Sequence, residues 1–237
     1  MKKILFILTV AILFIRCKKE QSIVLSETNV TMHYDEEKQL SVSFLDEEMD
    51  YTFTSSNKNI AIVSPSGLIH GVSIGEAVIT AKSTDGQYTA ECKVTIKPYH
   101  PFLFAELCCN FGAYKNEVKD FEKRELLEEK DQSLLYEGDM PYVAMVGYSF
   151  EDYKLIASII LIDTYMKDIL ATYLIERYEY MGNNNNVIYF KTYDNKVILG
   201  LSVSSYNNEY KYSILYFEIT SNKSNDINSI ISKFQAL

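Results

Sequence analysis

Apolar and polar residues alternate with a period of two along much of residues 22–98. The segments 40–44 and 91–96 show the alternation most clearly, with apolar side chains at every second position. Residues typical of turns interrupt it, as in Pro65–Gly67 and Asp85–Gly86. This pattern predicts short strands that each have one buried and one solvated face, joined by tight turns. Residues 22–98 are therefore expected to form an all-β sandwich.

Residues 99–237 combine helical and strand-like patterns. Helices are expected at 114–124, where Lys and Glu surround a narrow apolar face, and after Asp163, with Gly182 as the C-terminal cap. Strand-like runs follow each helix, at 133–136, 142–150 and 154–162 and then at 187–193, 196–204 and 212–220. A short terminal helix is expected at 226–234. A helix and three strands, repeated once, predict an α+β domain with the helices packed on one antiparallel sheet.

The first sixteen residues have the layout of a secretory signal. Lys2 and Lys3 precede an apolar run at 4–15 that is too short to cross a bilayer as a helix. The Cys that follows such a run, here Cys17, resembles the signal of bacterial lipoproteins, whose Cys is lipidated and becomes the first residue of the mature chain. Arg16 departs from the small residue that this family carries before the Cys. An ordinary signal peptide or an uncleaved anchor therefore stays an alternative.

These patterns divide the chain into four parts. They are a signal peptide (1–16), a short tether (17–21), the β module (22–98) and the α+β domain (99–237). The boundary between the last two parts rests on Pro98 and Pro101, because proline is rare inside strands and common in the loops that connect them.

An ordered series of motifs runs through the β module: YTFTSSNKNIAIVSPSGLIHGV at 51–72, GEAVITA at 75–81 and CKVTI at 92–96. This series resembles the bacterial Ig-like domain, group 2. Phe53 stands where this family usually carries Trp, and Asp35–Glu36 where a turn Gly is common. The resemblance implies an Ig-like sandwich that bacterial surface proteins use as a spacer or, in some adhesins, as a binding unit. It implies no chemistry.

The net charge of the chain limits the kinds of partner that we expect it to bind. The 237 residues have a formal net charge of −9, and removal of residues 1–16 would take away three basic residues and no acidic ones. No basic stripe is present that could neutralise phosphates, so no nucleic-acid partner is expected. An acidic chain also opposes lying flat on anionic lipid. The expected membrane contact is therefore the lipid anchor on Cys17.

The sequence offers few groups for catalysis or cofactor binding. Cys108 and Cys109 lie in an apolar run with only His100 nearby, so they are interpreted as buried structural thiols. Motifs for zinc, calcium, phosphate or dinucleotide binding are missing from the sequence, and we predict no metal and no cofactor. We predict no enzymatic activity. A small envelope glycan hydrolase stays an alternative, because its paired carboxylates are recognised only in three dimensions.

Tyrosine is concentrated in the α+β domain, with sixteen of the nineteen tyrosines at or after Tyr99. A Tyr side chain combines apolar area with a hydroxyl, so clustered Tyr suits the binding of proteins or glycans. The candidate ligand surface consists of Tyr189, Tyr193, Tyr206, Tyr210 and Tyr212. The alternative is that these side chains only pack across strands.

The expected protein is a non-enzymatic lipoprotein of the cell envelope, anchored in the outer membrane on its surface or periplasmic face. Its Ig-like module would act as a spacer or adhesion unit that presents the α+β domain to a protein or glycan. The alternative is a periplasmic inhibitor or envelope-assembly factor. It rests on a loose architectural resemblance of the helix-on-sheet repeat to small envelope assembly lipoproteins and secreted β-lactamase-inhibitor proteins.

Overall fold

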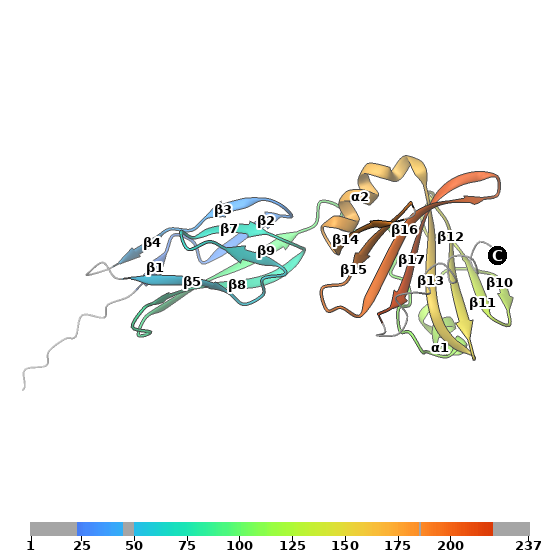
Figure 1. Cartoon of the computed structure of the whole chain (residues 1–237), viewed down its shortest axis with the longest axis horizontal. Coiled ribbons are helices and arrows are strands. Elements are labelled where there is room, and N and C mark those ends of the chain that lie inside the picture. Colours follow the sequence, from blue (N-terminus) through green and yellow to red (C-terminus); the bar gives the residue numbers. More distant parts are fainter. Residues whose placement is uncertain (1–22, 45–49, 185, 220–237) are drawn as a thin grey trace, which may run out of the picture.

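The computed structural model describes residues 23–44, 50–184 and 186–219, which form two modules joined in sequence (Figure 1). The expected signal peptide, the candidate lipidation site Cys17 and the helix expected at 226–234 lie outside these residues. Among the helices that the structure describes, none has the length and hydrophobicity needed to cross a bilayer.

The first module consists, within the described residues, of nine short strands. They are β1 (Ile23–Leu25), β2 (Asn29–His33), β3 (Glu37–Gln39), β4 (Val42–Phe44), β5 (Tyr51–Ser55), β6 (Ala61–Val63), β7 (Leu68–Gly71), β8 (Gly75–Ser83) and β9 (Thr89–Lys97). One sheet has the order β2-β9-β8-β5, in which β2 and β9 run parallel and the other pairs antiparallel. A second sheet has the order β3-β7-β6, and β1 pairs with β4.

The strands of the first module enclose one hydrophobic core. Burial follows the period of two, so that in β9 the side chains of Cys92, Val94 and Ile96 are buried while their neighbours are not. Phe53 is half-buried against this core and meets Tyr51 edge-on, with 5.5 Å between ring centroids. The predicted Ig-like sandwich is confirmed.

Asp35 occupies the turn position where the family resemblance suggests Gly. Its φ of 62° lies in the left-handed region, which Asp tolerates better than most residues. The Asp35 N–H donates to the carbonyl of Gly71 at 2.9 Å, and the Gly71 N–H donates to the carbonyl of Glu36 at 3.0 Å. These bonds to β7 hold the turn in place with Asp35, and not Gly, at the position of positive φ.

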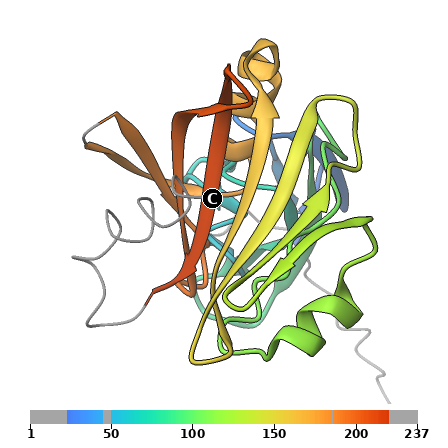
Figure 2. The ribbon, with the colours of Figure 1, turned by 90° about the vertical axis from the view of Figure 1, so that its right-hand side faces the viewer.

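The second module contains, in the part of the chain that the structure describes, two α-helices, a short 3-10 helix (Thr164–Met166) and eight strands. They are α1 (Lys115–Phe121), β10 (Leu126–Lys130), β11 (Ser133–Glu137), β12 (Val143–Glu151), β13 (Lys154–Asp163), α2 (Lys167–Ile175), β14 (Glu179–Asn184), β15 (Val187–Lys191), β16 (Val197–Tyr206) and β17 (Glu209–Glu218). The strands form one antiparallel sheet in the order β10-β11-β12-β13-β17-β16-β15-β14. Two four-stranded meanders thus meet where β13 pairs with β17, in the middle of the sheet (Figure 2).

Each half of this sheet carries one strand more than the sequence predicted. The additional strands, β10 and β14, lie at the two edges, and nearly all of their side chains are exposed. Gly182, the expected cap of the second helix, lies instead in β14 at a break in its register, because α2 ends at Ile175. The α+β class is confirmed, as a repeat of one helix and four strands instead of one helix and three.

The helices pack on one face of the sheet. Val118 of α1 and Leu170 and Leu174 of α2 belong to the same core cluster as Ile160 of β13. The neighbours of Ile160 in the chain point to the opposite face, where a second buried cluster comprises Met145, Ile159, Leu161, Leu215 and Phe217. The sheet therefore buries apolar side chains on both faces.

Candidate functional site

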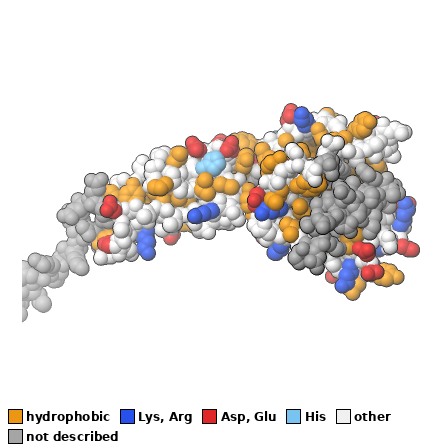
Figure 3. Space-filling model, viewed as in Figure 1, with side chains coloured by type: hydrophobic (Ala, Val, Ile, Leu, Met, Phe, Trp, Pro, Cys, Tyr) orange, Lys and Arg blue, Asp and Glu red, His pale blue; other side chains and the backbone are white. Residues whose placement is uncertain are grey.

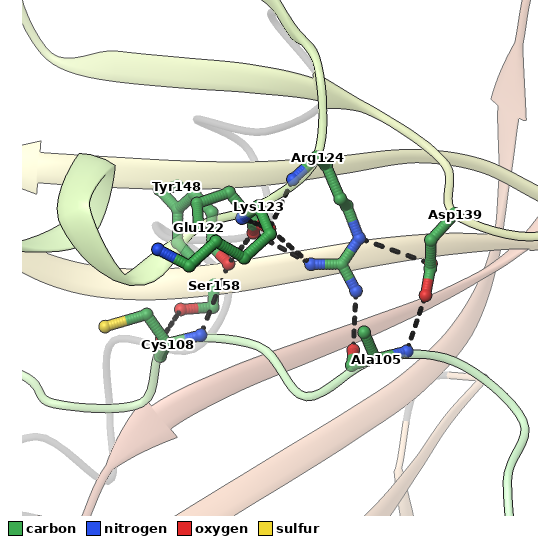
Figure 4. Close-up of polar contacts among 8 residues, drawn as sticks. All are labelled: Ala105, Cys108, Glu122, Lys123, Arg124, Asp139, Tyr148 and Ser158. Carbon is green, nitrogen blue, oxygen red and sulfur yellow. Dashed lines mark hydrogen bonds and ion pairs between the residues drawn. The ribbon is translucent and has the colours of Figure 1, made fainter.

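A buried ion-pair network lies where α1 leads into β10 (Figure 4). The helix ends at Phe121, and Glu122 leaves it with an extended backbone, at φ −72° and ψ 136°. Residues two apart in an extended segment share a face, so Glu122 and Arg124 point to the same side. Only 3% of the Glu122 side chain and 4% of the Arg124 side chain are exposed.

The Glu122 carboxylate accepts five hydrogen bonds from four donor groups. Arg124 Nη1 lies 2.8 Å from each of its oxygens, and the Tyr148 hydroxyl donates to Oε2 at 2.6 Å. The backbone N–H groups of Lys123 and Arg124 donate to Oε1 at 2.8 and 3.1 Å. A buried carboxylate is costly unless it is paired and hydrogen-bonded, and Glu122 is both. This geometry suits a structural acceptor better than a group that transfers protons.

Arg124 ties three separate segments together. Its Nε donates to Asp139 Oδ1, in the turn between β11 and β12, at 3.2 Å, and its Nη2 donates to the carbonyl of Ala105 at 2.5 Å. Asp139 Oδ2 in turn accepts the N–H of Ala105 at 2.6 Å. Two carboxylates, Glu122 and Asp139, thus share one guanidinium. We call these three charged residues the Arg124 network.

Tyr148 links the Arg124 network to the core. Its hydroxyl accepts the N–H of Cys108 at 3.2 Å while it donates to Glu122, and the Ser158 hydroxyl donates to the carbonyl of Cys108 at 2.6 Å. Burial, and secondarily the hydrogen bond to Glu122, raise the pKa of Tyr148 far above its ordinary value. Tyr148 is therefore a neutral hydrogen-bond donor throughout the physiological range.

A pocket of about 650 Å³ borders the Arg124 network. Two of its lining side chains are exposed aromatic rings, Phe102 at 58% and Phe121 at 44%. Three more are the exposed carboxylates of Glu106, Glu125 and Glu137. No Lys, Arg or His among the described residues forms an ion pair with any of the three. We call this apolar and acidic hollow the α1 pocket.

Neither the Arg124 network nor the α1 pocket was predicted from the sequence. Residues 121–125 read Phe-Glu-Lys-Arg-Glu, a mixture that is typical of a solvated surface. Burial of Glu122 and Arg124 depends on partners far along the chain, Asp139 and Tyr148. A buried pair of this kind has no local sequence signature.

The five tyrosines predicted as a ligand surface are not brought together by the fold. Tyr212 packs against the core on the helix side of the sheet, whereas Tyr206 packs against the cluster on the opposite face. Tyr189 is half-buried and lies opposite Gly200 on the neighbouring strand. Tyr210, at the start of β17, is the most exposed of the set at 73%. Each of these four therefore has a different environment.

Tyr193, the fifth, lies where the two modules meet. It is half-buried, and its side chain hydrogen-bonds with Ser73 of the Ig-like module. Burial raises the pKa of Tyr193. Its position makes it part of an internal contact.

Glu176, directly after α2, is the centre of this contact, which we call the joint. Its fully buried carboxylate accepts the N–H of Tyr99 at 2.8 Å and pairs with the neighbouring Arg177. Its backbone carbonyl accepts the N–H of Ile74 from the Ig-like module at 2.9 Å. Arg177 Nη2 donates to the carbonyl of His100 at 2.7 Å. Both modules and the segment between them therefore converge on one buried ion pair.

The described cysteines are free thiols. Cys92 and Cys108 are buried and Cys109 is half-buried. Burial raises the pKa of Cys109 to about 12, so its thiol is neutral at physiological pH. In the ranges that the structure describes, the His, Cys, Asp and Glu side chains form no group of three or more that could hold a metal ion.

Comparison with known proteins bears on the first module. Residues 21–94 match the family described as bacterial Ig-like domain (group 2). A search of curated proteins gives no significant match.

Two solved structures align with most of the chain at low similarity. The surface layer protein SbsC, domains 4–9, shares 15% identity over 85% of this chain, which spans only 27% of that structure, with a TM-score of 0.28. A mutant of intimin from EHEC O157:H7 shares 15% identity over 82% of this chain and 98% of its own, with a TM-score of 0.26. Scores this low support no inference about shared architecture or function. The family match and the sandwich of β1–β9 agree, however, and the N-terminal module of this chain is a bacterial Ig-like domain of group 2.

Proposed function

We propose that this protein is a non-enzymatic, lipid-anchored protein of the bacterial cell envelope, whose Ig-like domain is a spacer that presents the α+β domain to a protein or glycan partner. The observation that carries the proposal is the Ig-like domain at residues 21–94, which follows the apolar run at 4–15 and Cys17 in the sequence. The family resemblance implies a module that bacterial surface proteins use as a spacer or, in some adhesins, as a binding unit.

The arrangement of the two modules supports a presenting role. The first described strand, β1, lies toward the end of the Ig-like domain that is remote from the α+β domain (Figure 1). A tether at residues 17–21 would therefore leave the α+β domain as the part farthest from the membrane. The joint would hold it there in a fixed orientation, because its polar groups are buried and paired.

The surface charge is compatible with such a position. On the face shown in Figure 3, basic and acidic side chains are scattered over the described parts of both modules and no large basic patch appears. With a net charge of −9, the chain would be repelled from anionic lipid. Membrane attachment is thus assigned to the lipid on Cys17 and not to the folded modules.

Replacement of Cys17 tests the anchor. In the expressing bacterium, Cys17→Ala should lose incorporation of labelled palmitate and move from the membrane fraction to the soluble envelope fraction. Cys109→Ala, which removes a thiol of the folded domain, should keep both the label and the membrane location. Membrane retention of the Cys17→Ala protein without any label would contradict a lipid anchor.

Protease treatment of intact cells tests the side of the membrane. Cleavage of the α+β domain in intact cells is expected for a surface protein that presents this domain outward. The opposite result is protection in intact cells, with cleavage only after the outer membrane is permeabilised. That result would contradict presentation at the surface and favour the periplasmic alternative, an inhibitor or assembly factor.

A further inference from the structure

We propose that the α1 pocket binds a basic side chain, Lys or Arg, from an apolar segment of a partner protein. The proposal rests on the presenting role of the α+β domain and names the site and the class of partner. The pocket combines exposed aromatic rings with three acidic groups that form no ion pair with a described residue, and a long cationic side chain is the ligand that satisfies both.

Three of the acidic residues of the pocket come from separate chain segments. The N–H of Glu137 donates to the carbonyl of Glu125 at 2.9 Å, so the backbones of these two residues lie side by side. Glu106 adds a third carboxylate to the same lining. A cation in the pocket would neutralise part of this negative charge.

The cations that line the pocket do not supply this neutralisation. Arg124 is shared between Glu122 and Asp139, so the Arg124 network itself holds more negative than positive charge. Lys123 donates its ammonium to the carbonyl of Asp120 at 2.7 Å, within its own segment. The lining therefore has five carboxylates and two cations, and its potential attracts positive charge.

The exposed rings determine the kind of cation. Phe102 and Phe121 present ring surface to the pocket, and an ammonium or guanidinium over an aromatic face is attracted by the ring quadrupole. The aliphatic stem of Lys or Arg also packs on apolar surface while its head stays near the carboxylates. A bare metal ion would use the carboxylates and leave the rings exposed.

The surface beside the pocket favours a protein segment over a small cation. The edge strand β10 follows directly, with Leu126 exposed at 38% and Leu127 at 55%. Within the described part of the chain, no strand pairs with its outer edge. A partner segment that places a basic residue in the pocket would cover these leucines with its own apolar side chains.

The pocket is also held in shape before a ligand arrives. Arg124 fixes Ala105, Asp139 and Glu122 to one another through four hydrogen bonds of 2.5–3.2 Å. Binding to a preorganised site costs less ordering of side chains than binding to a flexible one.

Peptide binding to the purified full chain tests the proposal. The probes are three fluorescein-labelled twelve-residue peptides built from the repeat Ser-Leu-X, with X as Lys, Gln or Glu, and binding is followed by fluorescence anisotropy at moderate salt. The Lys peptide should bind and the other two should not. Glu125→Gln/Glu137→Gln should weaken binding of the Lys peptide by roughly tenfold, because two charges are lost with little change in shape.

Matched control variants distinguish the effect of the pocket from the effect of the overall charge of the protein. Glu91→Gln/Asp168→Asn removes the same two charges from β9 and α2 and should leave the affinity unchanged. Phe102→Ala should weaken binding, whereas Tyr165→Ala, which removes another exposed ring, should not. Equal losses in the pocket and control variants, or equal binding of all three peptides, would overturn the proposal. So would spermidine or Ca²⁺ binding in the pocket as tightly as the Lys peptide.

These outcomes are independent of the test of the anchor. Loss of palmitate from Cys17→Ala together with no peptide binding would refute the α1 pocket as a binding site and leave the presenting role intact. Peptide binding by the purified chain, together with no palmitate label on the parent protein in the expressing bacterium, would refute the anchor and leave the pocket intact.

Discussion

Tyr148 is the residue on which the buried charges of the α+β domain depend most directly. Its hydroxyl donates to Glu122 and accepts from the N–H of Cys108. We predict that Tyr148→Phe lowers the free energy of unfolding by about 1–3 kcal/mol, because a buried N–H loses its acceptor and a buried carboxylate loses a donor. Urea denaturation followed by circular dichroism measures the change.

Tyr136→Phe is the matched control for this prediction. Tyr136 is equally buried and lies edge-on to Tyr148 with 5.8 Å between ring centroids, but its hydroxyl has no hydrogen bond with a described residue. Its replacement should change stability by less than about 0.5 kcal/mol. If both variants were equally destabilised, ring packing and not the hydrogen bonds of Tyr148 would be responsible.

Individual residues also show why the candidate site could not be predicted from the sequence. Exposed and buried charges look alike in the run Phe121–Glu125, because burial is decided by Asp139 and Tyr148, which are distant in the sequence. The tyrosines of the predicted ligand surface show a different limit. Their spacing along β16 and β17 was visible, but strand alternation sends Tyr206 and Tyr212 to opposite faces of the sheet.

At the scale of elements, Gly67 allows the turn before β7 to approach the core of the Ig-like domain. Its φ is +87°, and a Cβ there would lie 2.5 Å from the carbonyl oxygen of Leu40 and 2.8 Å from the ring of Phe53. We predict that Gly67→Ala costs about 2 kcal/mol or more, since left-handed strain and a steric clash act together. Thermal unfolding of the full chain should show an earlier transition for this domain.

Gly86→Ala isolates the contribution of the backbone. Gly86 has a similar φ of +74°, but a Cβ there would meet only the flexible Lys82 side chain, at 3.4 Å. The expected cost is about 1 kcal/mol, from φ alone. A Gly86→Ala variant as unstable as Gly67→Ala would show that the close approach to Leu40 and Phe53 contributes little.

Elements with a buried face were predictable from the sequence, and elements without one were not. The alternation in β9 and the apolar runs of β12 and β13 predicted these strands because packing imposes a period of two on them. The edge strands β10 and β14 bury almost no side chains, so selection for a core left no pattern to detect. The helix expected after Asp163 was given Gly182 as its cap, but it ends at Ile175; Tyr178 packs against the core from beyond the helix, so an apolar position alone does not mark the end of a helix.

At the scale of the whole molecule, the joint determines whether the chain is one rigid unit or two linked ones. The ring of Tyr99 stacks on His33 of the Ig-like domain, with 4.6 Å between centroids and 18° between planes. Arg177, paired with Glu176, also lies over the ring of Tyr173 at 3.7 Å. These contacts bury polar groups that are satisfied only when both modules are in place, which favours a single orientation.

We predict that Glu176→Ala uncouples the two modules. The variant leaves the nearly buried Arg177 without its partner and the N–H of Tyr99 without its acceptor, which should cost about 3–5 kcal/mol at the joint. Nuclear spin relaxation should give one rotational correlation time for both modules of the parent chain and two different times for the variant. Glu179→Ala, which breaks the partly exposed pair with Lys191, should keep the single value. Two correlation times already in the parent chain would show that the joint is not rigid. The Ig-like domain would then not fix the direction in which the α1 pocket faces.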